Sequence, residues 1–158
     1  MRTTSTEGGL TFPIFVRKMG NPRNPLNPVQ YKMKHEDITH KIIGCAYQVY
    51  NHLGFGFLES IYKKAMIIEL SKINFKTEAE KLLKVYYDKQ IVGEFYVDLF
   101  TENEIVVELK SVQNLAKEHE VQLVNYLNGL KKEIGLLINF SPTGVEVKRK
   151  YRTDDADK

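Results

Sequence analysis

Hydrophobic residues recur at helical spacing in three parts of the chain. Between Ile38 and Val49 they repeat every three or four residues, which predicts a helix from about His35 to about Leu53. Two further segments show similar spacing and predict two more helices. These are residues 58–73, with Leu58, Ile61, Ala65 and Ile68 as the apolar stripe, and residues 117–131, with Val121, Val124, Leu127 and Leu130.

Five other segments are rich in β-branched and aromatic residues, as strands are. Two of them, residues 104–110 and 134–140, are apolar on both faces, which is typical of buried central strands. The element order is therefore helix, helix, three strands, helix, two strands, and it predicts an α/β domain. The five strands are residues 75–87, 91–101, 104–110, 134–140 and 145–151.

The pattern divides the chain into a body and two terminal segments. Residues 1–34 contain closely spaced glycine and proline and lack periodicity, so we expect a flexible extension. That extension carries +5, whereas the rest of the chain sums to −2. It is either a basic arm that contacts phosphates or an extension outside the functional fold. We expect the folded domain over residues 35–152 and a frayed acidic tail over residues 153–158.

Composition limits the class of protein. The chain has 158 residues, of which 42% are hydrophobic, and this suffices for one core without disulfides. The single cysteine, Cys45, falls in the first predicted helix, where it should behave as a small buried residue. No run approaches the roughly 18 apolar residues that span a bilayer. We therefore expect a soluble, cytoplasmic protein without a membrane partner.

Two acids and a lysine stand out in the hairpin predicted for residues 91–101 and 104–110. If its turn is centred on Asn103, Asp98 and Glu108 face each other with Cβ atoms about 4.5–5.5 Å apart. Lys110 then lies two residues along on the same face. These residues could be ordinary solvated charges of an edge hairpin. In a central strand, however, buried charges must be paired or bind metal.

Asp98 followed by Glu108-Leu109-Lys110, in this order of elements, resembles the core of the PD-(D/E)XK nuclease superfamily. Gly56-Phe57-Leu58-Glu59-Ser60-Ile61-Tyr62 resembles the motif that names the GxxExxY proteins of that superfamily. The resemblance covers residues 36–151, with Gly54-Phe55-Gly56 where relatives show Gly-Pro-Gly. It implies a mixed central β-sheet flanked by helices. Further similar segments are residues 42–44, 106–112, 119–127 and 135–140.

The resemblance also implies a metal site. Mg²⁺, for which Mn²⁺ can substitute, would be held by Asp98, Glu108 and the Leu109 carbonyl oxygen, since hard cations take oxygen ligands. Glu59 would complete the site directly or through water, although a carboxylate there could simply favour the helix dipole. Lys110 would orient the attacking water or stabilise developing negative charge.

Other candidate residues lie in the third helix and the last strand. Gln122 and Tyr126 share a helix face and resemble the Gln-x-x-x-Tyr motif of RecB-like nucleases. The resemblance implies that Gln122 helps to position the catalytic site and that Tyr126 lies near the substrate. Tyr126 could equally be a core residue. Lys148, Arg149 and Lys150 form either a phosphate-binding patch or the solvated face of an edge strand.

These observations predict a Mg²⁺-dependent nuclease that hydrolyses phosphodiester bonds, with DNA preferred over RNA as the nucleic-acid partner. A small nuclease that cuts both strands often works as a dimer, so a homodimer is compatible with this hypothesis. The alternative is a non-catalytic nucleic-acid-binding or protein-interaction module that retains the fold. The −2 charge of the body motivates this alternative.

Overall fold

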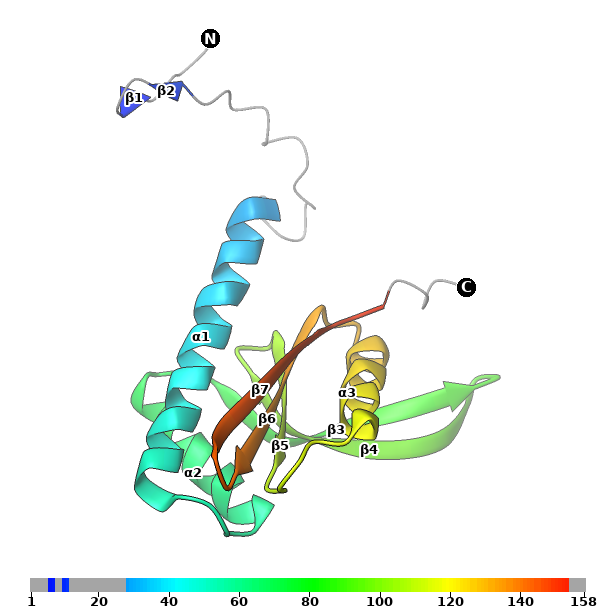
Figure 1. Ribbon diagram of the computed structural model, residues 1–158. Coiled ribbons are helices and arrows are strands. Elements are labelled where there is room, and N and C mark those ends of the chain that lie inside the picture. Colours follow the sequence, from blue (N-terminus) through cyan, green and yellow to red (C-terminus); the bar gives the residue numbers. More distant parts are fainter. Residues whose placement is uncertain (1–5, 8–9, 12–27, 154–158) are drawn as a thin grey trace. The chain divides into compact units, whose positions relative to one another are not determined.

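The computed structural model describes residues 6–7, 10–11 and 28–153 (Figure 1). The chain divides into two units, Met1–Asp37 and Ile38–Lys158. In the first unit, strands β1 (Thr6–Glu7) and β2 (Leu10–Thr11) pair antiparallel. Most of the predicted extension and tail lies outside the described residues.

Helix α1 (Pro28–Leu53) begins earlier than the sequence pattern predicts. The predicted start at His35 was wrong because the hydrophobic periodicity marks only the part of a helix that packs on a core. A proline is favourable at the first helical position, since that position has no intrahelical partner for its N–H group. The unit boundary falls within this helix, after Asp37.

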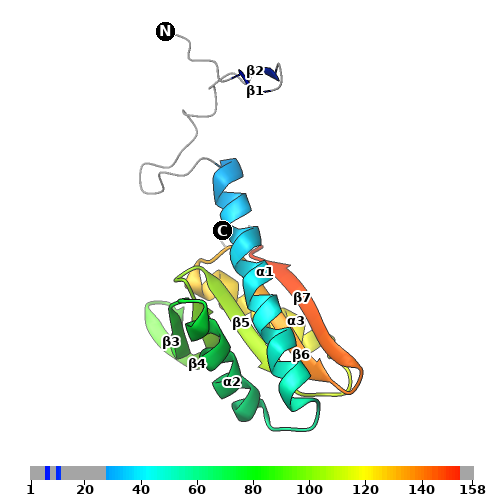
Figure 2. The same cartoon turned by 90° about the vertical axis from the view of Figure 1, so that its left-hand side faces the viewer.

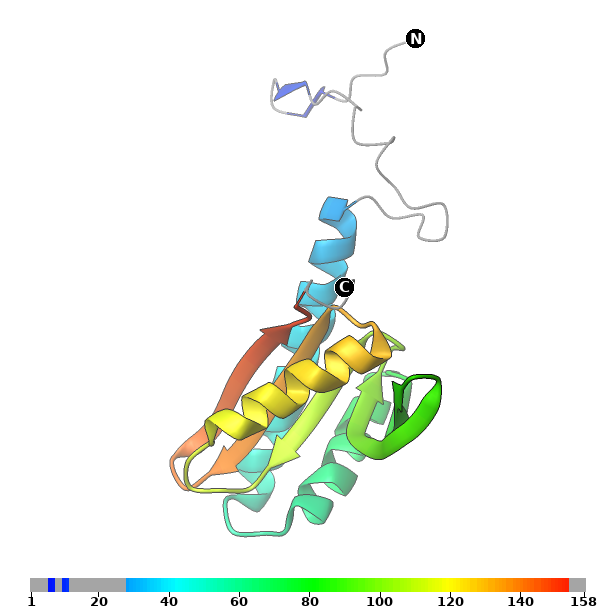
Figure 3. The ribbon, with the colours of Figure 1, turned by 90° about the vertical axis from the view of Figure 1, so that its right-hand side faces the viewer.

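The second unit is built on a five-stranded sheet in the order β3-β4-β5-β6-β7. Strands β5 and β6 pair in parallel and the other neighbours pair antiparallel, so the sheet is mixed, as predicted. Helices α1 and α2 lie on one face, and α3 covers the other (Figures 2 and 3). The bounds are α2 (Glu59–Lys72), β3 (Thr77–Tyr87), β4 (Gln90–Thr101), β5 (Ile105–Lys110), α3 (Lys117–Leu130), β6 (Ile134–Ser141) and β7 (Gly144–Tyr151).

Strand β5 is the central strand, as its apolar sequence predicts, and only Lys110 at its end is more than marginally exposed. Two hydrophobic clusters lie on the two faces of the sheet. The larger one joins α1 and α2 to the sheet, and the smaller one joins α3 to it. A site at the end of β5 is therefore held from both faces.

The predicted apolar stripe is correct for α1 and wrong for α2. In α1, Ile38 and Val49 are buried as expected. In α2, Ile61 and Ile68 are exposed, and the buried residues are Tyr62, Met66 and Leu70. The Tyr62 ring stacks on Phe140 with centroids 4.2 Å apart, and its hydroxyl donates to the Gly54 carbonyl oxygen. Because of these contacts, a different side of α2 faces the core from the side that the sequence pattern predicts.

In α3 the buried side is also shifted from the prediction. Leu123, Tyr126 and Leu127 are buried, whereas Val121 is exposed. The prediction that Leu127 is buried is confirmed. The buried side of the helix also includes Leu123 and Tyr126, because these side chains pack in the smaller hydrophobic cluster. Tyr126 is therefore part of the core of the domain.

Strands β3 and β4 form a long hairpin whose far end extends past the central sheet (Figure 1). Its turn residues, Asp88 and Lys89, both have positive φ, as a tight two-residue hairpin turn requires. Apolar side chains remain exposed toward this end, among them Val85, Tyr87 and Val92. Within the described ranges, no helix combines the length and apolarity needed to cross a membrane.

Candidate metal and nucleic-acid site

The register of β4 and β5 brings Asp98 and Glu108 to facing positions. The paired residues run from Thr101 opposite Ile105 to Leu99 opposite Val107. One step further along, Asp98 faces Glu108. The turn is centred on Asn103, which has a positive φ, as the sequence predicts. At the two acids, however, the regular backbone pairing stops.

Side chains replace the backbone hydrogen bonds beyond that point. The Asp98 N–H group donates to Glu108 Oε1 at 3.0 Å, and the Leu109 N–H group donates to Asp98 Oδ2 at 2.8 Å. Each carboxylate therefore accepts a hydrogen bond from the backbone of the opposite strand. This exchange fixes both acids where the two strands separate.

The pair of acids is electrostatically unfavourable when it stands alone. Glu108 is only 6% exposed, and its pKa is raised from 4.5 to about 8, first by burial and then by the charge of Asp98. The nearby Lys110 opposes this rise. In the absence of another cation, Glu108 therefore holds a proton at neutral pH. A bound divalent cation would provide the missing positive charge.

Lys110 lies two residues beyond Glu108 on the same strand and is half-buried. Its ammonium group forms no ion pair with the residues that the structure describes. The chain just after it is held by Asn139 of β6, whose side-chain amide accepts from the Val112 N–H group and donates to the Val112 carbonyl oxygen, both at 3.0 Å. Asn139 is fully buried and was not identified from the sequence.

Lys63 of α2 is a second cation at the acids and was also missed. Its Nζ lies 3.3 Å from Asp98 Oδ1 and 2.9 Å from Glu80 Oε1. Burial alone would lower the pKa of Lys63, but hydrogen bonds and charges from Glu80 and Asp98 outweigh it and raise the pKa. Glu80 has a positive φ and falls between the paired residues of β3, which marks a local irregularity.

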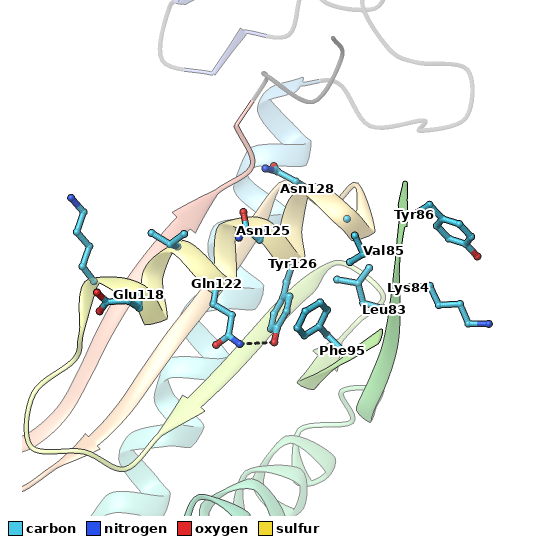
Figure 4. A pocket seen from close by; sticks show the side chains of 13 residues that line it. Leu83, Lys84, Val85, Tyr86, Phe95, Glu118, Gln122, Asn125, Tyr126 and Asn128 are labelled. Atoms are coloured by element: carbon cyan, nitrogen blue, oxygen red, sulfur yellow. Dashed lines mark hydrogen bonds between the residues drawn. The ribbon is translucent and has the colours of Figure 1, made fainter. Parts of the chain in front are cut away.

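Gln122 and Tyr126 approach the acids from α3. Gln122 Nε2 donates to the Tyr126 hydroxyl at 2.8 Å (Figure 4). Burial raises the pKa of Tyr126, and the charges of Glu108 and Asp98 raise it further. Tyr126 is thus a core residue whose pKa is affected by the two carboxylates, and its role in catalysis stays a prediction.

Comparison with known proteins identifies the family of the chain. The model of the PD-(D/E)XK nuclease superfamily matches residues 36–150. The protein belongs to this superfamily. Members are generally nucleases that use divalent metals and bind nucleic acid. The narrower likeness to GxxExxY proteins stays a prediction.

One similar solved structure is the crystal structure of SSO0001. It matches with a TM-score of 0.50 and 18% sequence identity, over 82% of this chain and 64% of that chain. The likeness shows a shared fold. The chain thus spans less than two thirds of the length of that structure. Comparison with curated proteins gave no significant match.

Glu59, the acid of the GxxExxY-like segment, is the first residue of α2 and is exposed. The Ser111 hydroxyl donates to the Phe57 carbonyl oxygen at 2.9 Å, which ties this end of α2 to the end of β5. Across the described ranges, no three acidic, histidine or cysteine side chains are grouped closely enough to hold a metal ion. Glu59 therefore does not join Asp98 and Glu108, and its metal role stays a prediction.

The basic residues of β7 are divided between the two faces of the sheet. The Arg149 guanidinium donates to Thr39 Oγ1 of α1 at 2.7 Å. Lys150 pairs with Glu120 of α3, and Lys148 is exposed. Successive residues of a strand point to opposite faces, so these three side chains do not form one patch. Their role in binding nucleic acid stays a prediction.

Proposed function

We propose that the protein is a divalent-cation-dependent nuclease that hydrolyses phosphodiester bonds in nucleic acid, with DNA preferred and Mg²⁺ as the cation. One observation carries the proposal. Asp98 and Glu108 are locked to each other's backbone where β4 and β5 separate, and the pKa of Glu108 is raised to about 8. A like-charged pair at this position is explained by a cation that binds between the two acids.

The donor atoms suit a hard cation. Two carboxylates supply oxygen ligands, and Mg²⁺ usually retains several waters, so few protein ligands are needed. Asp98, Glu108 and the Leu109 carbonyl oxygen would hold the ion. When bound, it would activate a water and neutralise charge at the scissile phosphate.

Neighbouring side chains would complete the chemistry. Lys110 has an ammonium group without an ion pair to the described residues, so it is free to orient the attacking water or to stabilise the developing negative charge. Tyr126, held by Gln122, would contact the substrate backbone near the two acids. Lys63 would hold Asp98 in place until the cation binds.

A non-catalytic module is the second candidate. The observation that favours it is the contact between Lys63 and Asp98, because a side-chain cation is already present at the acids. If that contact is purely structural, Asp98 and Glu108 would need no metal. The two candidates differ in whether the native protein binds a divalent cation.

Cleavage assays test the proposal. Purified protein is incubated with single- and double-stranded DNA and RNA in Mg²⁺ or Mn²⁺. We expect cleavage, and we expect Asp98→Asn and Lys110→Met each to lower its rate by about 100-fold or more. Lys64→Met is the matched control, because Lys64 is an exposed lysine of α2. No cleavage of any substrate, or equal rates in all variants, would contradict the proposal.

A further inference from the structure

A groove of about 800 Å³ lies between the β3–β4 hairpin and α3 (Figure 4). Two residues of the candidate site, Gln122 and Tyr126, form part of its wall. The hairpin side is apolar, and the helix side carries side-chain amides. The residues that define these two sides are Leu83, Val85 and Phe95 on the hairpin and Gln122, Asn125 and Tyr126 on α3.

We propose that this groove binds an unpaired nucleobase, so that single-stranded nucleic acid is the substrate class. The inference rests on the proposed nuclease function and deepens it. An unstacked base presents two flat apolar faces and a polar edge, and proteins bind such bases with aromatic rings and hydrogen-bonding side chains. The groove has both kinds of wall.

The aromatic surface comes from Phe95, whose ring lies against the buried ring of Tyr126. Their ring centroids are 5.9 Å apart, and Figure 4 shows the two side chains next to each other. Phe95 is 43% exposed although it faces the groove, so a flat ligand has access to its ring. Base stacking on such a ring is tolerant of sequence, because every base has a π-face.

The polar surface comes from the amides of α3. Asn125 is exposed, and its side-chain amide makes no hydrogen bond to the residues that the structure describes. Gln122 donates its Nε2 hydrogen to Tyr126, which leaves its carbonyl oxygen available as an acceptor. The helix side of the lining also contains one cation, Lys117, next to one acid, Glu118.

The groove shares two residues with the candidate catalytic site. Gln122 and Tyr126 line the groove, and the charges of Asp98 and Glu108 act on Tyr126. A base in the groove would therefore belong to a nucleotide close to the phosphate at the acids. Inside a duplex that base is stacked and paired, so it reaches the groove only from a single strand or from an unpaired position.

The test measures binding separately from cleavage. Fluorescence anisotropy in EDTA follows a labelled oligonucleotide of about 16 nucleotides, as single-stranded DNA, as single-stranded RNA and as the matching DNA duplex. We expect at least one single strand to bind about 10-fold more tightly than the duplex. Phe95→Ala should weaken single-strand binding by about 5-fold or more, as expected for the loss of one stacking contact.

Tyr96→Ala is the matched control. Tyr96 is an exposed aromatic residue of the same strand, but it is adjacent to Phe95 and so lies on the opposite face of the hairpin. We expect it to change single-strand affinity by less than about 2-fold. Asn125→Ala, which alters an exposed side chain of α3, should weaken binding in the same way as Phe95→Ala. Circular dichroism confirms that each variant is folded.

Three outcomes would overturn the inference. In the first, single strand and duplex bind equally well, and in the second, Phe95→Ala and Tyr96→Ala change the affinity equally. In the third, sedimentation equilibrium shows that the wild type is a dimer and Phe95→Ala is not, while single-strand affinity is unchanged; the groove would then bind a second copy of the chain. Single-strand binding without cleavage would contradict only the nuclease proposal. Cleavage of duplex without single-strand preference would contradict only the groove.

Discussion

Replacing Glu108 with glutamine should stabilise the metal-free protein at alkaline pH. The folded protein keeps Glu108 protonated up to about pH 8, whereas the unfolded chain loses that proton near pH 4.5. The native state therefore binds more protons between these values. The free energy of unfolding is therefore unaffected by this group below pH 4.5, and it falls as the pH rises from 4.5 through about 8.

The size of the effect follows from the shift. Each pH unit between the two pKa values lowers the free energy of unfolding by about 1.4 kcal/mol. The loss is thus on the order of 3 kcal/mol at pH 7 and 5 kcal/mol above pH 8. Glu108→Gln resembles the protonated acid and has no such loss. The variant should equal the wild type near pH 4.5 and exceed it in stability by several kcal/mol above pH 8.

Urea unfolding in EDTA, followed by far-ultraviolet circular dichroism from pH 5 to pH 9, measures this difference. Glu133→Gln is the control, because Glu133 is an exposed carboxylate between α3 and β6 and its replacement should leave the pH dependence unchanged. A Glu108→Gln variant that is no more stable than the wild type above pH 8 would refute the reasoning about the buried acid pair.

Three further predictions concern the same site. Because cation binding must displace the Glu108 proton, Mn²⁺ affinity measured by calorimetry should rise about tenfold per pH unit below pH 8; a flat profile from pH 6 to 8 would contradict this. Lys63→Met removes a competing cation from Asp98 and should strengthen Mn²⁺ binding by about 3-fold to 5-fold, whereas weaker binding would show that Lys63 supports the metal site. Asn139→Ala leaves the Val112 N–H and carbonyl groups without their partner and should lower the free energy of unfolding by about 2–3 kcal/mol in urea; a loss below about 1 kcal/mol would mean that water replaces the amide.

The central part of the site could be predicted from sequence because local rules determine it. The turn at Asn103 sets the register, and a strand has a period of two, so Asp98 must face Glu108. The apolar run before Lys110 identifies β5 as the central strand. The superfamily match over residues 36–150 agrees with the element order that this pattern gave.

Residues that depend on distant contacts could not be predicted. The phase of α2 is set by Tyr62, which stacks on Phe140 far along the chain. If α2 had packed with the side that the sequence pattern predicts, Lys63 would have been an ordinary surface lysine. Its contact with Asp98 was therefore missed. The clamp of Asn139 on Val112 likewise joins two strand ends that only the fold brings together.

The basic residues of β7 show the opposite error, in which sequence proximity suggested a shared surface. Alternation along the strand sends Arg149 toward α1 and Lys150 toward α3. A cluster of like charges in sequence therefore need not be a cluster in space.

The most direct test of the metal site is the anomalous scattering of Mn²⁺ in crystals of the protein. The proposal predicts one strong peak between β4 and β5, with Asp98 and Glu108 oxygens at about 2.1 Å from the ion, and no such peak in crystals of Glu108→Gln. The proposal would be contradicted if crystals soaked in saturating Mn²⁺ showed no anomalous density at these acids and Lys63 kept its contact with Asp98.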